Sequence, residues 1–392
     1  MFSLAVIRLT RPYFDEAERE AVARVLASGM LVQGPRVAEF EARVAERLGG
    51  TEADPVFAVA VTNGTTALEL ALATVGPAGV GPGDEVILGA LTWPSPGNAV
   101  LLRGATPVLV DIDPTTWNAP PHAVSRALNP RTRAVVAIDQ FGVPAEIPAL
   151  RAVCSDVALV EDAACALGSS LGGVPCGLLG DLGTFSFHPR KVITTGEGGM
   201  LTTRDGALAT RLRTLRNHGQ RSPGDFEGFG PNARMCEMQG ALGVSQMVKL
   251  DDILSRRRAL ADELRAAVAL GWQGAPEGAV VNHQTAGFVL PPPEAGRRQS
   301  DRVGARDALV AALRAEGVEA GALSYALHRL PAFVQAKGPV RLPVAEAVVD
   351  GGVAVPLHPG MTGGDLAVVI DALRRHAGWA LGRGSALPEG GR

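Results

Sequence analysis

The sequence predicts an α/β fold built around a mixed, mostly parallel sheet and followed by a smaller α+β unit. Short apolar runs alternate with helical patterns through residues 1–250, as they do in chains of βαβ units. The remaining chain is more broken and shows one clear strand and one clear helix. The 392 residues are 46% hydrophobic and 20% charged, which is enough for a core in each unit. We therefore expect a large domain over 1–250, a small domain over 251–380 and a flexible tail over 381–392.

The expected elements follow from the period of the apolar residues, which is two in a half-buried strand and 3.6 in a helix. Strands are expected at 56–61, 85–88, 107–111, 134–138, 157–160, 183–187 and 200–203. Helices are expected at 14–26, 65–74, 97–102, 122–128, 147–153, 207–216 and, as one long helix, 241–265. The small domain adds a strand at 287–290 and a helix at 306–316. Ligands of parallel sheets bind in the loops at the carboxyl ends of the strands, so we look for chemistry there.

Composition excludes several classes of protein. A net charge of -3 without a basic run argues against general nucleic-acid binding. There is no run of about 18 apolar residues that could span a membrane, and Met1–Ile7 is too short for a secretory signal. The four cysteines form no C-x-x-C pair, which argues against a disulfide framework or a zinc site and fits the reducing cytoplasm. No metal is expected.

Primary amines are scarce, because only Lys191, Lys249 and Lys337 are lysines among 37 basic residues. Lys249 is expected on a solvated helix face and Lys337 in a turn. Lys191 follows a strand that ends at Ser186. A lysine that is partly desolvated at such a strand end has a lowered pKa and can act as a nucleophile. The alternative is an ordinary surface lysine.

Two further strand ends carry polar groups. The strand at 157–160 leads into Glu161 and Asp162, and the small residues that follow leave room for a flat ligand; an N-cap is the simpler reading of the acid. Asn63, Gly64 and Thr65 join a strand to a helix and offer N–H groups and a hydroxyl to an anion. A capping turn alone explains this second segment equally well.

Trp93 lies in a loop after the strand at 85–88 and could stack on a flat ring, or could simply pack. Taken together, the four elements describe one ligand. A phosphate would bind at a helix N-terminus and a hydroxyl, and a planar ring would stack on an aromatic side chain. A nitrogen of that ring would face a carboxylate, and an aldehyde would face an amine. Pyridoxal phosphate requires these groups.

Longer motifs carry a resemblance to a known family. They lie at 28–41, 63–68, 82–86, 104–108, 110–113, 141–145, 161–164, 185–191, 196–199, 216–219, 232–235, 325–328 and 356–359. On these residues the chain resembles, nearly end to end, the DegT/DnrJ/EryC1/StrS family of pyridoxal-phosphate-dependent sugar aminotransferases. The resemblance implies the fold-type-I, aspartate-aminotransferase-like architecture.

The resemblance also implies roles for particular residues. Lys191 would form the Schiff base with the cofactor and shuttle a proton, and Asp162 would keep the ring nitrogen protonated. Family active sites lie at a homodimer interface. The remaining implied contacts are those of Gly64, Thr65 and Ser186 with the phosphate, Trp93 with the ring, Asn232 with the phosphate of the neighbouring subunit, and Gly34, Tyr325 and His328 with the substrate.

The implied reaction moves an amino group from an amino acid, glutamate or glutamine, to a keto sugar in secondary-metabolite or glycan biosynthesis, and the expected keto sugar is nucleotide-linked. A cyclitol or another small ketone is the alternative acceptor. The dehydratase branch of the family, with His at the lysine position, is disfavoured by Lys191. A non-catalytic regulatory protein that binds the cofactor is disfavoured by the intact set of Lys191, Asp162 and Ser186.

Three positions depart from the family pattern. Cys165 stands where Gln or His is common, which affects a polar contact near the ring. Trp93 stands where Phe or Tyr is more usual, and a Trp at this position resembles the cyclitol-specific branch. The segment 291–302 forms a loop whose arginines could contact a phosphorylated substrate, or could simply be solvated.

Overall fold

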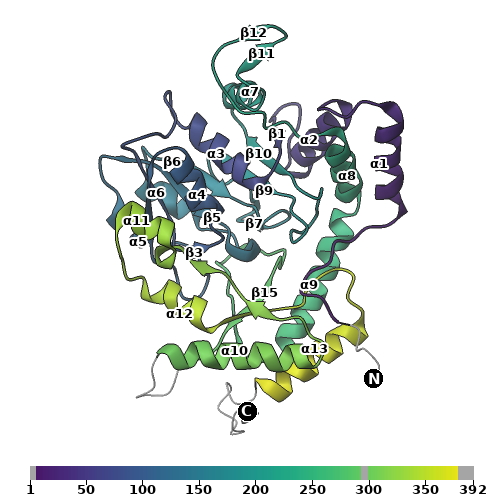
Figure 1. The fold of residues 1–392 in the computed structure, drawn as a ribbon, viewed down its shortest axis with the longest axis vertical. Helices are drawn as coiled ribbons and strands as arrows, with labels where there is room; N and C mark the ends of the chain where they lie inside the picture. Colours follow the sequence, from purple (N-terminus) through teal and green to yellow (C-terminus); the bar gives the residue numbers. More distant parts are fainter. Residues whose placement is uncertain (1–5, 293–298, 378–392) are drawn as a thin grey trace.

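The computed structural model describes residues 6–292 and 299–377 (Figure 1); the predicted tail at 381–392 and residues 293–298 of the predicted loop at 291–302 lie outside these ranges. The loop prediction is wrong for residues 299–302, which begin the helix α10 (Gln299–Ala315). Arg302 is buried there and donates to the carbonyl of Leu290.

At the centre of the structure is a seven-stranded sheet in the order β1-β10-β9-β6-β5-β2-β4. β10 alone among these strands runs against its neighbours. This confirms the predicted α/β fold with a mixed, mostly parallel sheet. The strands are β1 (Phe57–Val61), β2 (Glu85–Gly89), β4 (Thr106–Val110), β5 (Thr132–Ile138), β6 (Ala158–Asp162), β9 (Leu182–Ser186) and β10 (Gly199–Thr203).

Helices cover both faces of this sheet, so its strands are apolar on both sides. In β2, Val86 and Leu88 belong to the core on one face, whereas Ile87 between them belongs to the core on the other. The first face is covered by α3 (Gly64–Thr74), α4 (Ser95–Leu102) and α7 (Gly206–Leu215). The second is covered by α5 (Pro121–Ala127) and α6 (Ile147–Val153).

Beside β1, the second face is covered by α2 (Pro35–Arg47) and the start of α9 (Leu250–Ala267). Phe40 of α2 meets Phe187 edge to face, with ring centroids 4.9 Å apart. Outside this layer, α1 (Glu16–Ser28) and α2 both pack on α8 (Glu237–Val248).

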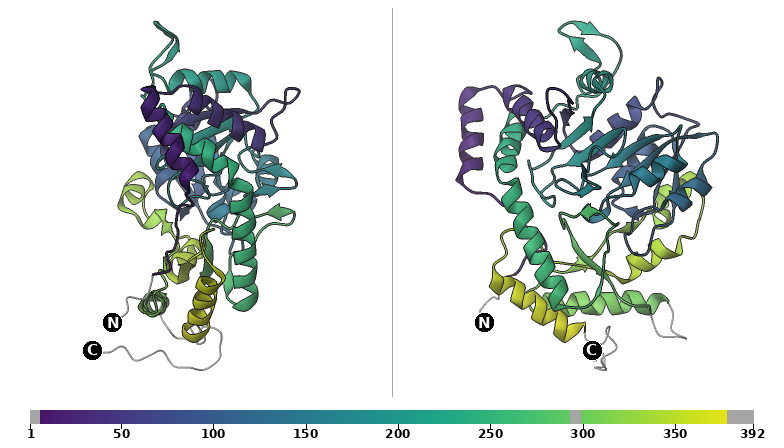
Figure 2. Two further views of the ribbon diagram at one scale, coloured as in Figure 1. Left: turned by 90° about the vertical axis from the view of Figure 1, so that its right-hand side faces the viewer. Right: turned by 180° about the vertical axis from the view of Figure 1, so that it is seen from behind.

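A second core lies at the far end of α9 (Figure 2). It is built on an antiparallel sheet of β13 (Gly271–Trp272), β15 (Ala286–Val289), β18 (Gly352–Val355) and β16 (Gly321–Ala322). α9, α10 (Gln299–Ala315) and α13 (Gly363–His376) cover it. Ile7 also joins this core, pairing with Val318. The expected boundary between residues 250 and 251 remains a prediction.

The single long helix predicted at 241–265 is wrong, because the chain forms α8 and α9, which meet at Lys249. The N–H of Lys249 bonds to the carbonyl of Gln246, three rather than four residues back. Its Nζ lies 2.7 Å from carboxylate oxygens of Asp15 and Glu18. The break lets α8 pack on α1 while α9 continues into the second core.

The chain then returns to the main sheet before its last strand. β17 (Tyr325–Ala326) pairs with β3 (Leu91–Thr92), and it is followed by η2 (Leu327–Arg329), α11 (Pro331–Lys337) and α12 (Pro343–Gly351). Phe333 packs in the first-face core. The smaller pairings are β7 (Ser170–Leu171) with β8 (Val174–Pro175) and β14 (Ala279–Val280), and β11 (Gln220–Ser222) with β12 (Asp225–Phe226); η1 spans Gln140–Gly142. Across the described residues, no helix is both long enough and apolar enough to cross a membrane.

Candidate active site

The register of the main sheet brings several predicted site residues to one edge. Val61, Gly199 and Ser186 are direct partners across β1, β10 and β9. Asp162 ends β6, the next strand, and pairs with Thr184. Because β6, β9 and β1 run in the same direction, the loops after all three open on this edge. The edge is where ligands of parallel sheets bind.

The loop after β1 forms a small cradle. Asn63 caps α3, and its side chain accepts a hydrogen bond of 2.9 Å from the N–H of Thr66. A Cβ on Gly64 would lie 2.8 Å from the Cβ of Ser186, so only glycine fits there. The Thr65 hydroxyl is hydrogen-bonded to the hydroxyl of Ser95. Hydroxyls and the helix N–H groups thus converge where an anion is favoured.

Asp162 is buried at the end of β6. Burial raises the pKa of its carboxyl, while the positive charge of Lys191 and the N–H of Ala164 oppose that rise. The N–H of Ala164 donates to Oδ1 over 3.1 Å. The carboxylate of Asp162 therefore lies near a cation. It also lies in a low-dielectric environment, where a hydrogen bond to a partner nitrogen is strong.

Lys191 projects from the loop after β9 toward the same group of residues. Its Nζ lies 3.1 Å from the Sγ of Cys165, three positions after Asp162. Its backbone N–H is fixed by the carbonyl of His188. The structure thus joins two positions singled out from the sequence, the scarce amine and the cysteine that departs from the family pattern.

The other two lysines are held in ion pairs. Lys249 is not on a solvated helix face, as the sequence suggested, but has a side chain only 14% exposed between Asp15 and Glu18. Burial lowers the pKa of Lys249, but the hydrogen bonds to these carboxylates raise it above its ordinary value. Lys337 ends α11 and reaches Glu85 over 2.8 Å. Neither amine lies among the strand-end groups.

Two aromatic residues of the prediction lie side by side. The β3–β17 pairing sets Tyr325 opposite Thr92, next to Trp93. The rings of Trp93 and Tyr325 meet edge to face, with centroids 5.5 Å apart. Trp93 is 60% exposed, so it is not the packing tryptophan of the simpler reading. His328 follows Tyr325 by three residues and is buried, and its Nε2 lies 3.2 Å from Oε1 of Glu346.

Gly34 and Asn232 have other contacts in the structure. The N–H of Gly34 donates to Glu237 over 2.8 Å at the start of α2. Asn232 is exposed and forms an isolated antiparallel β-bridge with Asn217. Two residues later, Arg234 forms such a bridge with Val61. Within the described residues, no hydrogen bond links Gly34 or Asn232 to Lys191, Asp162 or Ser186.

A basic wall beside Lys191 was not predicted. A narrow cavity is lined by Lys191 together with Arg11, Arg190, Arg257 and His358. Burial lowers the pKa of His358, and the charges of Arg257 and Arg11 lower it further. The sequence offered one signal, since His358 lies in a family-like motif. The arginines could not be distinguished among so many others before the fold was known.

Behind Asp162 lies a buried pair of carboxyls. Glu161 accepts hydrogen bonds from the N–H groups of Gly177, Leu179 and Gly180. Asp139 accepts one backbone hydrogen bond, from Ala145, and its Oδ2 has no donor among the described residues. The thiol of Cys176 lies beside this pair and acts to lower the pKa of Asp139. Burial raises the pKa of both carboxyls, and the charge of Glu161 raises that of Asp139 further. We assign the charge to Glu161 and a proton to Asp139.

Comparison with known proteins agrees with this geometry. The profile of the DegT/DnrJ/EryC1/StrS aminotransferase family matches residues 12–374. The chain is 33% identical to a dTDP-4-dehydro-2,3,6-trideoxy-D-glucose 4-aminotransferase of Saccharopolyspora spinosa over 94% of this chain and 96% of that protein. It is 34% identical to a GDP-perosamine synthase of Caulobacter vibrioides, over 95% of this chain and 99% of that protein.

A solved structure extends the likeness to the fold. The aminotransferase TlmJ from Streptoalloteichus hindustanus superposes with a TM-score of 0.86 at 33% identity. The match covers 96% of this chain and 100% of that one. The protein therefore belongs to the DegT/DnrJ/EryC1/StrS aminotransferase family.

Proposed function

We propose that the protein is a pyridoxal-phosphate-dependent aminotransferase that moves an amino group from glutamate or glutamine to a nucleotide-linked keto sugar. The observation that carries the proposal is the meeting of an amine, a carboxylate and an anion cradle at one edge of one sheet. Lys191, Asp162 and the Gly64–Ser186 contact supply these groups. Each fits a different part of the cofactor.

The residues present fit pyridoxal phosphate. The cradle would hold the phosphate, because a side chain at position 64 would fill it and α3 directs its N–H groups there. Asp162 would hold the ring nitrogen, Trp93 would cover one face of the ring, and Lys191 would face the aldehyde. When bound, the cofactor supplies an aldehyde that reacts with amines and a ring that accepts an electron pair.

The chain itself orients the groups and moves the proton. Asp162 keeps a proton on the partner nitrogen by remaining ionised, and the nearby charge of Lys191 favours this form. The Nζ of Lys191 would accept the proton from the substrate carbon and deliver it to the cofactor carbon. Cys165, 3.1 Å from Nζ, fixes the position of the amine.

Two observations support an anionic, nucleotide-linked acceptor. Both curated relatives are named for nucleotide-linked sugars. Arg11 and Arg190 of the basic wall line the narrow cavity together with Lys191, and arginine is the residue best suited to carboxylates and phosphates. The exposed Trp93 keeps a cyclitol ketone as the second candidate, since its ring offers a broad apolar face.

We propose in addition a cytoplasmic homodimer with shared sites. The loop between α1 and α2 exposes Met30, Leu31 and Val32, and the β11–β12 arm exposes Phe226 and Phe229, the latter by 88%. Large exposed apolar side chains of this kind are typical of association surfaces. The four cysteines are all free thiols, which supports a reducing compartment.

A screen of donors and acceptors tests the proposal. The protein loaded with pyridoxal phosphate is mixed with glutamate or glutamine, and the change of cofactor absorbance is followed. A dTDP-linked 4-keto sugar or a keto-inositol is then added, and we expect the sugar to restore the original spectrum. Restoration by the keto-inositol alone would favour the cyclitol reading, and no change with any amino acid would refute the aminotransferase.

A further inference from the structure

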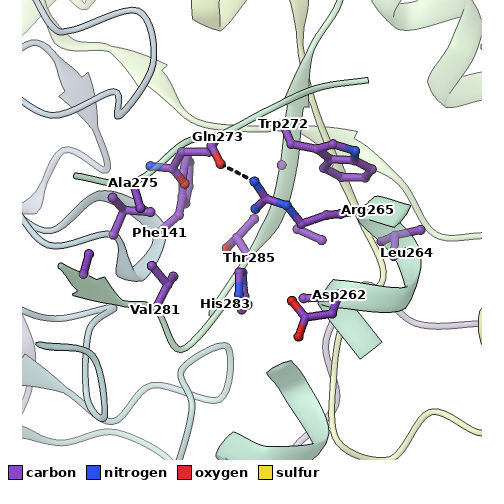
Figure 3. A pocket seen from close by; sticks show the side chains of 15 residues that line it. Phe141, Asp262, Leu264, Arg265, Trp272, Gln273, Ala275, Val281, His283 and Thr285 are labelled. Carbon is purple, nitrogen blue, oxygen red and sulfur yellow. Dashed lines mark hydrogen bonds between the residues drawn. The ribbon is translucent and has the colours of Figure 1, made fainter. Parts of the chain in front are cut away.

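A second cavity, of about 240 Å³, lies between α9 and the segment that leads into β15 (Figure 3). Its apolar walls include Phe141 and Val143, at and just after η1, and Leu264 and Trp272, which also pack in the second core. None of the residues assigned to the cofactor or its substrates lines it. The cavity is therefore separate from the candidate active site.

Two charged side chains line this cavity, Arg265 inside it and Asp262 at its rim. The Nη2 of Arg265 donates to the carbonyl of Gln273 over 2.8 Å, and Figure 3 shows the guanidinium between Gln273 and Thr285. Among the described residues, no carboxylate lies within salt-bridge distance of it. Asp262, one turn earlier on α9, is exposed at the rim, and its negative charge partly opposes the lowering of the pKa of Arg265 by burial. A half-buried guanidinium without a paired acid favours a bound anion.

The surrounding charge is also positive. Besides Arg265, both Arg257 and Arg258 act on His283, against the single carboxylate of Asp262. Burial, reinforced by these charges, lowers the pKa of His283 to about 4. The imidazole is thus neutral at pH 7 and offers one donor and one acceptor.

His283 is held in this position by its backbone. Its φ of 51° is unusual for a residue other than glycine. The residues on either side pin it, because Asn282 donates to the carbonyl of Cys165 and Gln284 donates to that of Arg190, both over 2.8 Å. Such strain is typical of positions that serve a ligand. The same hydrogen bonds connect the cavity wall to the residues that flank Lys191.

We infer that this cavity binds a small organic monoanion, with its carboxylate on Arg265 and its apolar or aromatic body against Trp272 and Phe141. The size supports this class of ligand. A cavity of roughly 150 Å³ holds benzene, so 240 Å³ accommodates a benzoate-sized molecule but not a nucleotide-linked sugar. The site is distinct from that of the proposed transfer reaction and does not depend on it.

Calorimetric titration with benzoate, in the absence of any amino donor or acceptor, tests the inference. We expect one saturable site per chain, with benzyl alcohol binding roughly tenfold more weakly because it lacks the charge. Arg265→Gln should weaken benzoate binding by about tenfold or more. Arg256→Gln is the matched control, since Arg256 is exposed on the same helix and paired with Asp252; it should leave binding unchanged.

A crystal of the unaltered protein soaked in 4-bromobenzoate gives an independent reading, because Arg265→Gln also removes the bond to Gln273. The anomalous peak of bromine should lie inside the cavity, with the carboxylate on Arg265. A peak beside Lys191, no peak at all, or equal benzoate affinity in Arg265→Gln would overturn the inference. Transaminase activity without benzoate binding would overturn this inference and leave the proposed function standing. Benzoate binding without transaminase activity would do the opposite.

Discussion

At the level of single residues, burial and hydrogen bonding determine which of the two carboxyls behind Asp162, those of Glu161 and Asp139, holds a proton. Glu161 has three backbone donors and Asp139 has one. Two unprotonated carboxylates this close in a buried site would repel strongly. A proton on Asp139 removes the repulsion and supplies Glu161 with a further donor. Glu161 directly precedes Asp162, so the pair supports the carboxylate of the candidate site from behind.

Asp139→Asn should therefore be at least as stable as the unaltered protein above neutral pH, because an amide replaces a carboxyl that is already neutral. In the unfolded chain Asp139 ionises above its ordinary pKa of 3.8, whereas in the folded protein it keeps its proton. Stability should fall by up to about 1.4 kcal/mol per pH unit between that value and the higher folded pKa. The Asp139→Asn variant should lack this contribution to the fall of stability with rising pH.

Glu161→Gln is the contrasting change. It replaces one acceptor oxygen by an NH2 group that faces backbone donors, and it should cost about 1–3 kcal/mol or more. Urea unfolding of both variants at pH 5, 7 and 9 measures these effects. Parallel pH profiles for Asp139→Asn and the unaltered protein would contradict the assignment of the proton.

Single residues were predictable where strand ends expose them. Lys191, Asp162 and Ser186 could be named from their positions after apolar runs. Asp139, Arg257 and Arg265 could not, because their importance depends on which distant segments the fold brings against them. Trp93 could be named, but its exposure depends on the pairing of β3 with β17.

At the level of elements, α2 begins against a carboxylate from another helix. Glu237 is buried and accepts hydrogen bonds from the N–H groups of Gly34, Arg36 and Val37. These are donors that a helix start leaves without partners, and the negative charge also matches the helix dipole. Glu237 thus does for α2 what an N-cap side chain does in other helices.

Glu237→Gln should destabilise the fold by roughly 1–3 kcal/mol, because the charge is lost and one of the two acceptor atoms becomes a donor. Glu39→Gln is the control on α2 itself. Glu39 is more exposed and pairs only with Arg36 and Arg43, so its change should cost about 0.5 kcal/mol or less. Equal losses in urea unfolding would show that Glu237 contributes no more than a surface charge.

The regular elements were predictable and the irregular ones were not. The strands of the main sheet have continuous apolar runs, and β6 and β9 were placed to within two residues. β13, β16 and β18 are two to four residues long, too short to display a period. At the break between α8 and α9, Lys249 pairs with Asp15 and Glu18. These partners lie far away in the sequence, so no local pattern predicted the contact.

At the level of the whole molecule, the proposed homodimer makes each site depend on two chains. The β11–β12 arm projects beyond α7 (Figure 1), and Asn232 follows it with an exposed side chain. In the proposed dimer Asn232 reaches the phosphate of the neighbouring subunit. Lys191 and Asp162 serve the site of their own chain.

Mixing two inactive variants tests this sharing. When Lys191→Ala and Asn232→Ala subunits are dissociated and reassociated, half of the dimers are mixed and each has one native site, so about a quarter of the unaltered activity should return. Lys191→Ala mixed with Asp162→Asn should recover nothing, because both changes affect the same side of the site. Failure of the first mixture to exceed its separate components would contradict a shared site.

The central claim is that one amine among the three lysines holds the cofactor. Borohydride reduction of the loaded protein converts the bond between that amine and the cofactor into a stable secondary amine, and peptide mapping then locates it. We predict a single labelled peptide, modified at Lys191, and no label in Lys191→Arg, since a guanidinium stays protonated. A label on Lys249 or Lys337, or persistent labelling of Lys191→Arg, would contradict the account.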